Sequence, residues 1–135
     1  MDLVKTTIAA LIATIIFYGI AAAICLAQVA LPAKTGTASW YSSESCKREG
    51  TSGIMANGRR LNDGEFIAAS WDFKFGTRLK VTNLENGKAT IVVISDRGPS
   101  IRLYRKGRIL DLSKSAFAAI ACLRSGIIKI RIEEI

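Results

Sequence analysis

A hairpin signal over residues 77–95 constrains the fold of this chain more than any other stretch. Polar and apolar residues alternate from Thr77 to Leu84, as they do in a strand with one buried face. Asn86-Gly87 then supplies a tight turn, and Ala89 to Ser95 provides the partner strand. The chain is therefore expected to build a sheet around this hairpin.

Other short segments have the same β-type character. Residues 37–41 suit a first strand, 127–132 alternate as a final strand, and 65–71 suit either a strand or a turn-rich element. One short helix is expected to begin at the cap Ser113 and to run to about residue 121. Many short strands with one helix favour an all-β closed barrel, because a small open sheet leaves its edges exposed.

The N-terminal segment must be set aside from the fold, because it carries no charge from Thr6 to Ala33. It is typical of a signal peptide, and cleavage after Ala27 is the favoured cut. The apolar run is also long enough to cross a bilayer of about 30 Å, so an uncleaved membrane anchor is the alternative. We therefore divide the chain into a targeting segment, residues 1–33, and one domain, residues 34–135, whose first residues, 34–37, form a linker.

Charge points to an anionic partner for the exported domain. The chain has a net charge of +8, with 19 Lys and Arg against 11 Asp and Glu. An exported basic protein meets cell-wall polymers and lipid headgroups, so nucleic acid is not the expected partner. The basic run Arg102, Arg105, Lys106 and Arg108 is either a solvated face or a site for an anionic wall polymer.

Cysteine and histidine content limits the chemistry. Beyond the N-terminal segment only Cys46 and Cys122 occur, which makes them a disulfide candidate after export, with two free thiols as the alternative. The chain has no His. The usual zinc sites and a Ser-His-Asp triad are therefore not expected, and no metal or cofactor is predicted.

Two carboxylates stand next to turn residues at the ends of apolar stretches. Asp96 follows Ile91-Val92-Val93-Ile94 and precedes Arg97-Gly98-Pro99, and Asp111 lies within the segment 107–113. A strand end at a sharp turn is a common place for a site, although such an Asp also often bonds its own backbone. Local pattern alone leaves both interpretations open.

A set of short motifs, taken in order, resembles one known family. The motifs are Ala38-Ser39-Trp40-Tyr41, Met55-Ala56-Asn57-Gly58, Ala68-Ala69-Ser70, Phe75-Gly76-Thr77, Val81-Thr82-Asn83-Leu84, Asp96-Arg97-Gly98-Pro99 and Gly107-Arg108-Ile109-Leu110-Asp111-Leu112-Ser113. Each piece is weak alone, but the ordered set is specific. It resembles the rare lipoprotein A (RlpA) family.

The resemblance implies a six-stranded double-psi β-barrel that acts on peptidoglycan as an endolytic lytic transglycosylase, leaving 1,6-anhydromuramyl ends. Two positions depart from the family pattern: Arg59 stands where a Glu is usual and Ser70 where a His is usual. Of the polar residues associated with activity, only the Asp carries over, onto Asp96. The rival hypothesis is therefore a barrel that binds or loosens the wall without cleaving it.

One carboxylate is sufficient for such a reaction in principle. A lytic transglycosylase uses the muramyl C6 hydroxyl instead of water, so Asp96 could act first as acid and then as base. Burial would have to raise the pKa of Asp96 for this, and an Arg97 guanidinium pointing at it would oppose the rise. A guanidinium pointing outward could instead bind a peptide carboxylate of the substrate. Glu65 would restore a second carboxylate if it reached the groove.

The remaining candidates are assigned to substrate binding: Tyr41, Asn57, Gly58, Arg59, Ser70, Arg97, Gly98 and Asp111. For Asp111 a structural role, bonding backbone N–H groups where the helix begins, is the favoured interpretation. Asn57-Gly58 is as typical of an ordinary turn as of a groove wall. Trp40, Tyr41 and Trp71 suit either sugar stacking or burial in a small barrel. The expected partner is a peptidoglycan glycan strand in the periplasm or cell envelope, with cell-division proteins as candidates for further partners.

Overall fold

The computed structural model describes residues 2–26 and 32–135. The chain divides into two compact units, residues 1–30 and residues 31–135, and each is described by itself. The predicted cleavage site after Ala27 lies outside the described residues.

The first unit holds one helix, α1 (Asp2–Leu26). Large apolar side chains along it are exposed, among them Leu3, Ile8, Ile15 and Phe17. Within residues 2–26 and 32–135, no helix combines the length and the apolar character needed to cross a membrane.

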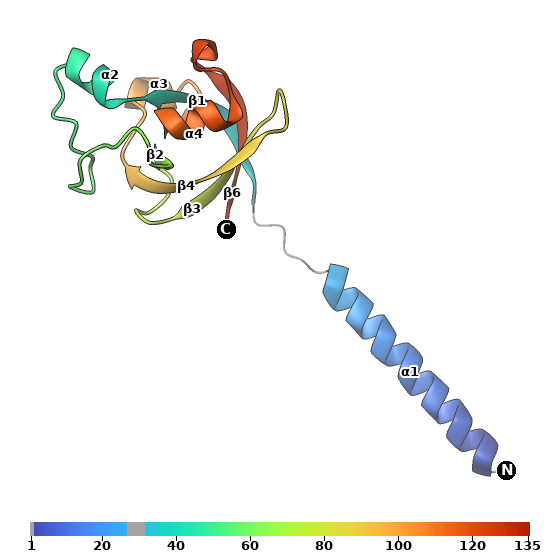
Figure 1. Ribbon diagram of the computed structural model, residues 1–135. Helices are drawn as coiled ribbons and strands as arrows, with labels where there is room; N and C mark the ends of the chain where they lie inside the picture. The colour runs from blue at the N-terminus through green and yellow to red at the C-terminus, as the bar shows by residue number, and fades with distance from the viewer. Residues whose placement is uncertain (1, 27–31) are drawn as a thin grey trace. The chain divides into compact units, whose positions relative to one another are not determined.

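The second unit is a closed barrel of six strands, which confirms the predicted fold class (Figure 1). The strands are β1 (Lys34–Tyr41), β2 (Ile67–Ala69), β3 (Arg78–Asn83), β4 (Ala89–Asp96), β5 (Arg108–Ser113) and β6 (Ile128–Glu134). Around the barrel they follow the order β1-β5-β2-β4-β3-β6, in which β6 also pairs with β1. The predicted hairpin is confirmed as the antiparallel pair of β3 and β4.

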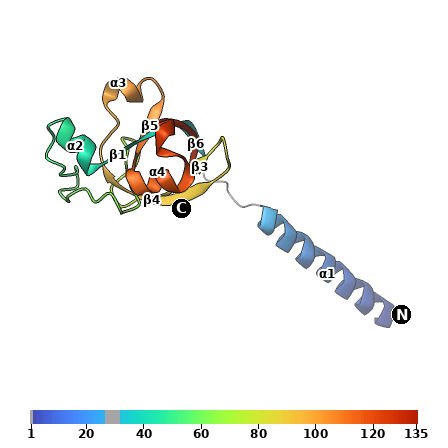
Figure 2. The same ribbon diagram turned by 45° about the horizontal axis from the view of Figure 1, so that its top comes forward.

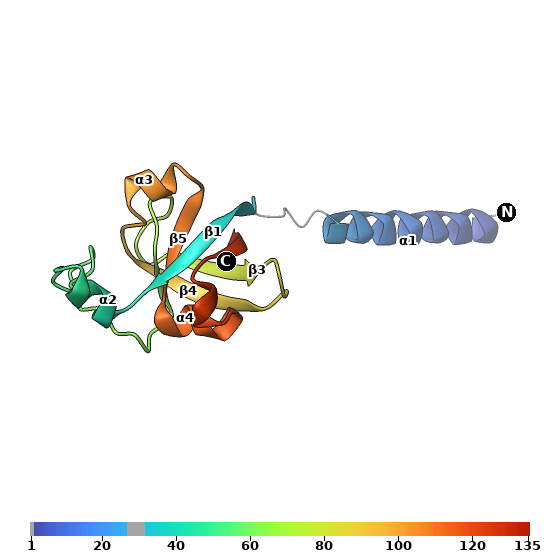
Figure 3. The ribbon, with the colours of Figure 1, turned by 90° about the horizontal axis from the view of Figure 1, so that it is seen from above.

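Two strand pairs in the barrel are parallel. β1 pairs with β5, and β2 pairs with β4, while the other neighbours are antiparallel. Figure 3 shows β1 running beside β5. The parallel pairs bring the C-terminal ends of strands that are distant in sequence to one end of the barrel, where a site can form.

The barrel interior is filled by alternate apolar side chains and by one helix. Leu79, Val81, Leu110, Leu112 and Ile130 are fully buried in one cluster. The helix α4 (Lys114–Ile120) adds Ala116, Phe117 and Ile120 to it, and Figure 2 shows α4 against the ring of strands. Ser113 caps this helix as predicted, because its Oγ accepts the N–H of Ala116.

A glycine permits the close approach of β1 and β5. A Cβ on Gly36 would lie 2.8 Å from two side-chain carbons of Ile109 and 2.9 Å from the Gly107 carbonyl oxygen. Because atoms do not approach so closely without displacement, the position requires glycine.

The residues expected to form a linker, 34–37, are instead the first half of β1, where Lys34 pairs with Ile132 of β6.

The barrel carries more short helices than the one predicted. They are α2 (Ser43–Arg48), α3 (Ile101–Tyr104) and the 3-10 turn η1 (Leu123–Ser125). Helix α2 begins at a capping box, in which Ser42 Oγ accepts the N–H of Ser45 and Ser45 Oγ accepts the N–H of Ser42. The two hydrogen bonds join residues only three positions apart. They explain how a helix of six residues forms in a segment whose composition is typical of a loop.

The candidate disulfide is not formed in this structure, in which Cys46 and Cys122 are both free. Cys46 lies on α2 and packs against a small cluster of Met55, Leu61 and Ile67. Cys122 is exposed and precedes η1. The two thiols therefore lie on different elements with different neighbours.

Candidate functional site

Four residues from neighbouring strands form one row across the barrel wall, and we call it the site row: Ser39, Asp111, Ala69 and Asp96. Asp111 of β5 pairs with Ser39 of β1 on one side and with Ala69 of β2 on the other, and Ala69 also pairs with Asp96 of β4. Two interstrand spacings separate the two aspartates, so their Cα atoms lie about 10 Å apart. The backbone register alone thus brings both carboxylates to one place.

A β-bulge puts Asp96 into the site row. Ala68 pairs with Ile94, but the next residue of β2, Ala69, pairs with Asp96, so one extra residue, Ser95, interrupts the register. Ile94 and Ala68 belong to the barrel core. Because side chains alternate along a strand, the extra residue turns Asp96 to the face away from that core, next to Ala69.

The site row borders a cavity of about 300 Å³. The cavity is lined by Tyr41, Ser45, Cys46, Glu49, Thr51, Gly53, Ile54, Met55, Leu61, Ala69, Asp96, Arg97 and Asp111. One wall therefore comes from strands and the other from α2 and the loop 49–61. Three of the lining side chains are carboxylates, so the cavity is acidic although the chain is basic overall.

The Asp96 carboxylate is held by two backbone donors. Its Oδ1 accepts the N–H of Ala56, from the opposite loop, at 2.8 Å and the N–H of its own neighbour Arg97 at 2.8 Å. Donors of this kind stabilise a negatively charged oxygen. The arrangement suits Asp96 to a role in which it carries charge or accepts a proton.

Asp111 has a different environment from Asp96. Burial raises the pKa of the Asp111 carboxyl, and the negative charges of Asp96 and Glu49 raise it further. Two groups lower this pKa. The Ser39 hydroxyl donates a hydrogen bond to Asp111 Oδ1 at 2.6 Å, and Arg108 contributes a nearby positive charge. The net effect is a raised pKa, so the Asp111 carboxyl keeps its proton to a higher pH than an ordinary aspartate does.

The structural role favoured for Asp111 is not observed. Helix α4 is capped by Ser113, whereas the Asp111 carboxylate bonds Ser39 on β1 and lines the cavity. The sequence pattern predicts Asp111 at the beginning of the helix, but β5 continues through Asp111 to Ser113, so Asp111 lies on the barrel wall.

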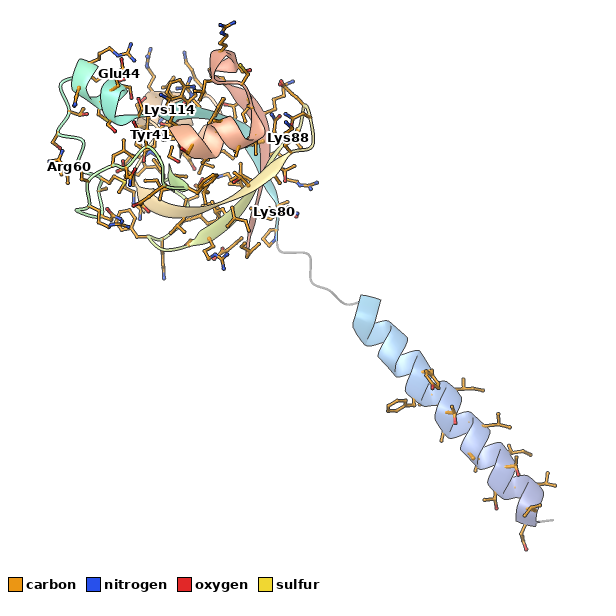
Figure 4. All side chains as sticks on the ribbon, in the orientation of Figure 1. Tyr41, Glu44, Arg60, Lys80, Lys88 and Lys114 are labelled. Carbon is orange, nitrogen blue, oxygen red and sulfur yellow. The ribbon has the colours of Figure 1, made fainter. Side chains whose placement is uncertain are left out.

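Tyr41 lies at the end of β1 that adjoins α2, where Figure 4 labels it. Its ring lines the cavity, and among the described residues its buried hydroxyl has no hydrogen-bond partner. Burial raises the pKa of Tyr41, and the charges of Asp96 and Asp111 add to the effect. Tyr41 therefore keeps its proton and presents an unused donor beside both carboxylates.

Arg97 points in neither of the two predicted directions. Its Nη1 donates to the carbonyl oxygens of Ser70 at 2.7 Å and Phe73 at 2.8 Å, and its guanidinium lies 4.0 Å from the centre of the Phe75 ring. The guanidinium thus fixes the segment after β2 instead of pairing with Asp96. A Cβ on the next residue, Gly98, would lie 3.6 Å from Asp111 Oδ2, so Gly98 abuts the second carboxylate.

Five predicted binding residues do not line the cavity: Asn57, Gly58, Arg59, Ser70 and Gly98. Asn57 and Gly58 form a tight turn, in which Asn57 Oδ1 accepts the N–H of Arg59 at 3.0 Å. The Arg59 guanidinium pairs with Glu65 at 3.2 Å, so Glu65 is not the second carboxylate of the cavity. Ser70 is fully buried and its Oγ accepts the N–H of Asp72.

Sequence reasoning missed most of the loop wall. Cys46, Glu49, Ile54, Met55 and Leu61 line the cavity, but nothing in their local pattern indicates a site. Ala69 was quoted only as part of a motif, yet its small side chain lies between the two carboxylates. Its importance follows from strand pairing, which becomes visible only in the fold.

Comparisons with known proteins agree with this architecture. The sequence model of the family described as "Lytic transglycolase" matches residues 33–132. A protein of Synechocystis sp. named "Probable endolytic peptidoglycan transglycosylase RlpA" is 44% identical over 94 residues, which are 70% of this chain and 26% of that protein. The "Endolytic peptidoglycan transglycosylase RlpA" of Rickettsia typhi is 39% identical over 101 residues, which are 74% of this chain and 29% of that protein. The chain thus spans less than a third of the length of these two relatives.

Solved structures share the fold. The Streptomyces papain inhibitor superposes with a TM-score of 0.58 at 23% identity and covers 77% of this chain and 94% of its own. An expansin of Clavibacter michiganensis superposes with a TM-score of 0.56 at 23% identity, over 77% of this chain and 50% of that one. At such identities the likeness extends to the barrel and not to the site.

Proposed function

The chain belongs to the RlpA-like lytic transglycolase family, and from that premise we propose that it cleaves peptidoglycan glycan strands endolytically to 1,6-anhydromuramyl ends. The observation that carries this proposal is the pair of carboxylates in the site row. Asp96 and Asp111 come from strands on either side of β2, line one cavity and differ in environment.

Carboxylate spacing supports acid–base chemistry on a glycosidic bond. Glycosidases place their two carboxyl groups about 5 to 10 Å apart on opposite sides of that bond. The Cα atoms of Asp96 and Asp111 lie about 10 Å apart. Because both side chains line one cavity, their carboxyl groups can lie within that range. The cavity therefore has room for the linkage between two sugars.

We assign the acid to Asp111 and the base to Asp96. Protonated Asp111 donates its proton to the glycosidic oxygen as the bond from the muramyl C1 to that oxygen breaks. The C6 hydroxyl of the same muramyl unit forms the new bond to C1 and gives its proton to Asp96. Asp111 then ends ionised and Asp96 protonated, and transfer of one proton from Asp96 to Asp111 restores the site.

This division replaces the single-carboxylate route expected from the sequence. That route required burial to keep a proton on Asp96, whereas Asp96 Oδ1 accepts two backbone N–H groups that favour a charged oxygen. Burial raises the pKa of Asp111 instead. Tyr41, whose hydroxyl is free to donate, would bind an oxygen of the sugar between them.

The rival function is a barrel that binds glycan without cleaving it. The observation in its favour is that the positions of the family Glu and His carry Arg59, paired to Glu65, and the buried Ser70. Neither side chain contributes an acid or a base to the cavity. On this hypothesis Asp96 and Asp111 would bind sugar hydroxyls only.

The deciding experiment is mass spectrometry of peptidoglycan digested by the purified full chain, scored for 1,6-anhydromuramyl ends. Wild-type protein should produce them, and Asp96→Asn and Asp111→Asn should each abolish them. Glu134→Gln, which removes an exposed carboxylate of β6, is the matched control and should retain activity. If Asp111→Asn keeps its activity and Asp96→Asn does not, the single-carboxylate route is restored. If the wild-type protein binds sacculi but forms no anhydromuramyl ends, the barrel binds glycan without cleaving it.

Cellular placement follows from the same proposal. Peptidoglycan lies outside the cytoplasm, and the N-terminal unit is an apolar helix whose described side chains are exposed. We therefore propose that residues 1–33 direct export and that the barrel works in the cell envelope. Partnership with cell-division proteins stays a prediction.

A further inference from the structure

Trp71 is an exposed aromatic side chain with a fixed orientation. It remains 45% exposed, whereas the other tryptophan, Trp40, is partly buried against the core and donates its N–H to the Leu123 carbonyl. The Trp71 Nε1–H donates to the Pro99 carbonyl oxygen at 2.6 Å. The polar edge of the indole is thus satisfied by the protein while much of its surface stays open to solvent.

Trp71 does not line the cavity, but its segment is joined closely to residues that do. It follows the cavity residue Ala69 by two positions, and its partner Pro99 follows Asp96 by three. Three residues span at most about 11 Å, so the Trp71 indole edge is held close to the carboxylate that we assign as base. A ligand longer than the cavity would reach it.

The segment that carries Trp71 is fixed on both sides. Asp72 pairs with Lys34 at 2.7 Å and accepts the Tyr104 hydroxyl. On the other side Arg97 bonds the carbonyl oxygens of Ser70 and Phe73. Because these contacts tie the segment to β1, α3 and β4, the indole is presented with little conformational freedom left to lose when a ligand binds.

We propose that Trp71 forms an aromatic subsite on which a pyranose ring of the glycan strand stacks, next to the rings held in the cavity. The inference rests on the proposed function and extends it. A sugar ring has an apolar face and carries its polar groups at the edge. The exposed face of an indole whose N–H is already bonded to the protein can stack on that apolar face. The subsite should therefore favour oligosaccharides that are long enough to occupy both the cavity and Trp71.

Tryptophan fluorescence tests this subsite directly, because the chain has only two tryptophans. In a Trp40→Phe variant of the full chain, Trp71 is the only source of indole emission. Titration with soluble glycan strands freed of their stem peptides should shift that emission to shorter wavelength and saturate. The reciprocal Trp71→Phe variant should show no shift, and a maltose oligomer should leave both unchanged.

Three variants separate stacking from support of the loop. Trp71→Ala should weaken binding of the same strands by about three- to tenfold, and Trp71→Phe, which keeps a ring but loses the N–H, should stay within about twofold of wild type. Phe66→Ala removes an aromatic of similar exposure, 44%, outside the cavity lining and should change nothing. Equal loss in Trp71→Phe and Trp71→Ala would overturn the subsite in favour of a structural N–H.

The assay of anhydromuramyl ends on the same proteins distinguishes failure of the subsite from failure of the proposed function. If anhydro ends form and Trp71 emission does not respond, the subsite is wrong and the function stands. If emission responds and no anhydro ends form, the subsite stands on a barrel that binds without cleaving. If neither occurs, both proposals fall.

Discussion

The two walls of the cavity differ in how their residues are held in place. The strand wall carries the site row and Tyr41, and backbone pairing fixes each position in it. The loop wall, residues 49–61 with α2, contributes a mixture of apolar and polar side chains, among them the Glu49 carboxylate, and one backbone N–H, that of Ala56. The two groups proposed to react thus lie where strand register fixes them, while the loop would enclose the substrate.

This difference explains how Arg59 can stand where the resemblance leads us to expect a Glu without altering the proposed site. Arg59 belongs to the loop 49–61 and turns away from the cavity to pair with Glu65. Substitution there alters no strand pairing and leaves both carboxylates of the site row in place. The proposed acid and base therefore both come from the strand wall, and the contribution of each wall can be tested separately.

Replacing Asp111 by Asn should have the largest effect on activity. Loss of the proposed acid should lower the rate of glycan cleavage by about 10²- to 10⁴-fold, measured as anhydromuramyl ends formed with time. Wild-type cleavage should decline as pH rises through the pKa of Asp111, because the acid must be protonated. A variant that cleaves at the wild-type rate would return both proton transfers to Asp96 alone.

Replacing Ala69 by Leu should separate the substrate from both carboxylates without removing either. The larger side chain has the cavity of about 300 Å³ to enter, so the barrel should fold at an overpacking cost of about 1–3 kcal/mol. Displacement of the sugar by an ångström or more should lower the cleavage rate by about 10²-fold. Circular dichroism checks the fold, and full activity in a folded variant would contradict the assignment of the cavity.

Replacing Tyr41 by Phe tests the donor at the edge of the strand wall. The buried hydroxyl has no partner among the described residues, so its removal should cost little stability. Loss of one hydrogen bond to the sugar should lower kcat/KM by about tenfold. An unchanged kcat/KM together with a raised melting temperature would show that the hydroxyl is only a buried polar group.

The Asp111→Asn variant should also change stability in a pH-dependent manner. A carboxyl with a raised pKa in the folded state stabilises the fold at low pH and loses that contribution as pH rises through its folded pKa. At neutral pH the neutral Asn should therefore give a higher free energy of unfolding than Asp, and the difference should shrink toward pH 3. Urea unfolding at the two pH values measures it, and a difference that grows on acidification would contradict the raised pKa.

Replacing Arg59 by Ala should have the smallest effect. Its ion pair with Glu65 is exposed on the arginine side, and pairs of this kind contribute between about 0 and 1 kcal/mol. Because neither side chain lines the cavity, cleavage should stay within about twofold of wild type. A large loss of activity would show that the loop wall takes part in the reaction and would end the distinction between the walls.

The sequence predicted the barrel better than the site. Alternation and turn residues were enough for the β3–β4 hairpin and for the cap at Ser113. The motif residues Asp96 and Asp111 were identified, but their division of roles depends on burial and on backbone donors that are distant in sequence, such as the N–H of Ala56. The direction of a side chain also cannot be predicted from the residues next to it. Arg97 donates to carbonyl groups of a segment more than twenty residues earlier in the chain.

The bulge at Ser95 implies that the register of β4, as much as the chemistry of its residues, decides where this barrel presents a carboxylate. Without the bulge, strict alternation would place Asp96, two residues after Ile94, on the same face as Ile94 and turn it toward the core. The composition of the strand would be unchanged, but its carboxylate would be lost from the cavity wall. A designer could thus turn an acidic side chain toward or away from a barrel core by adding or removing one bulge.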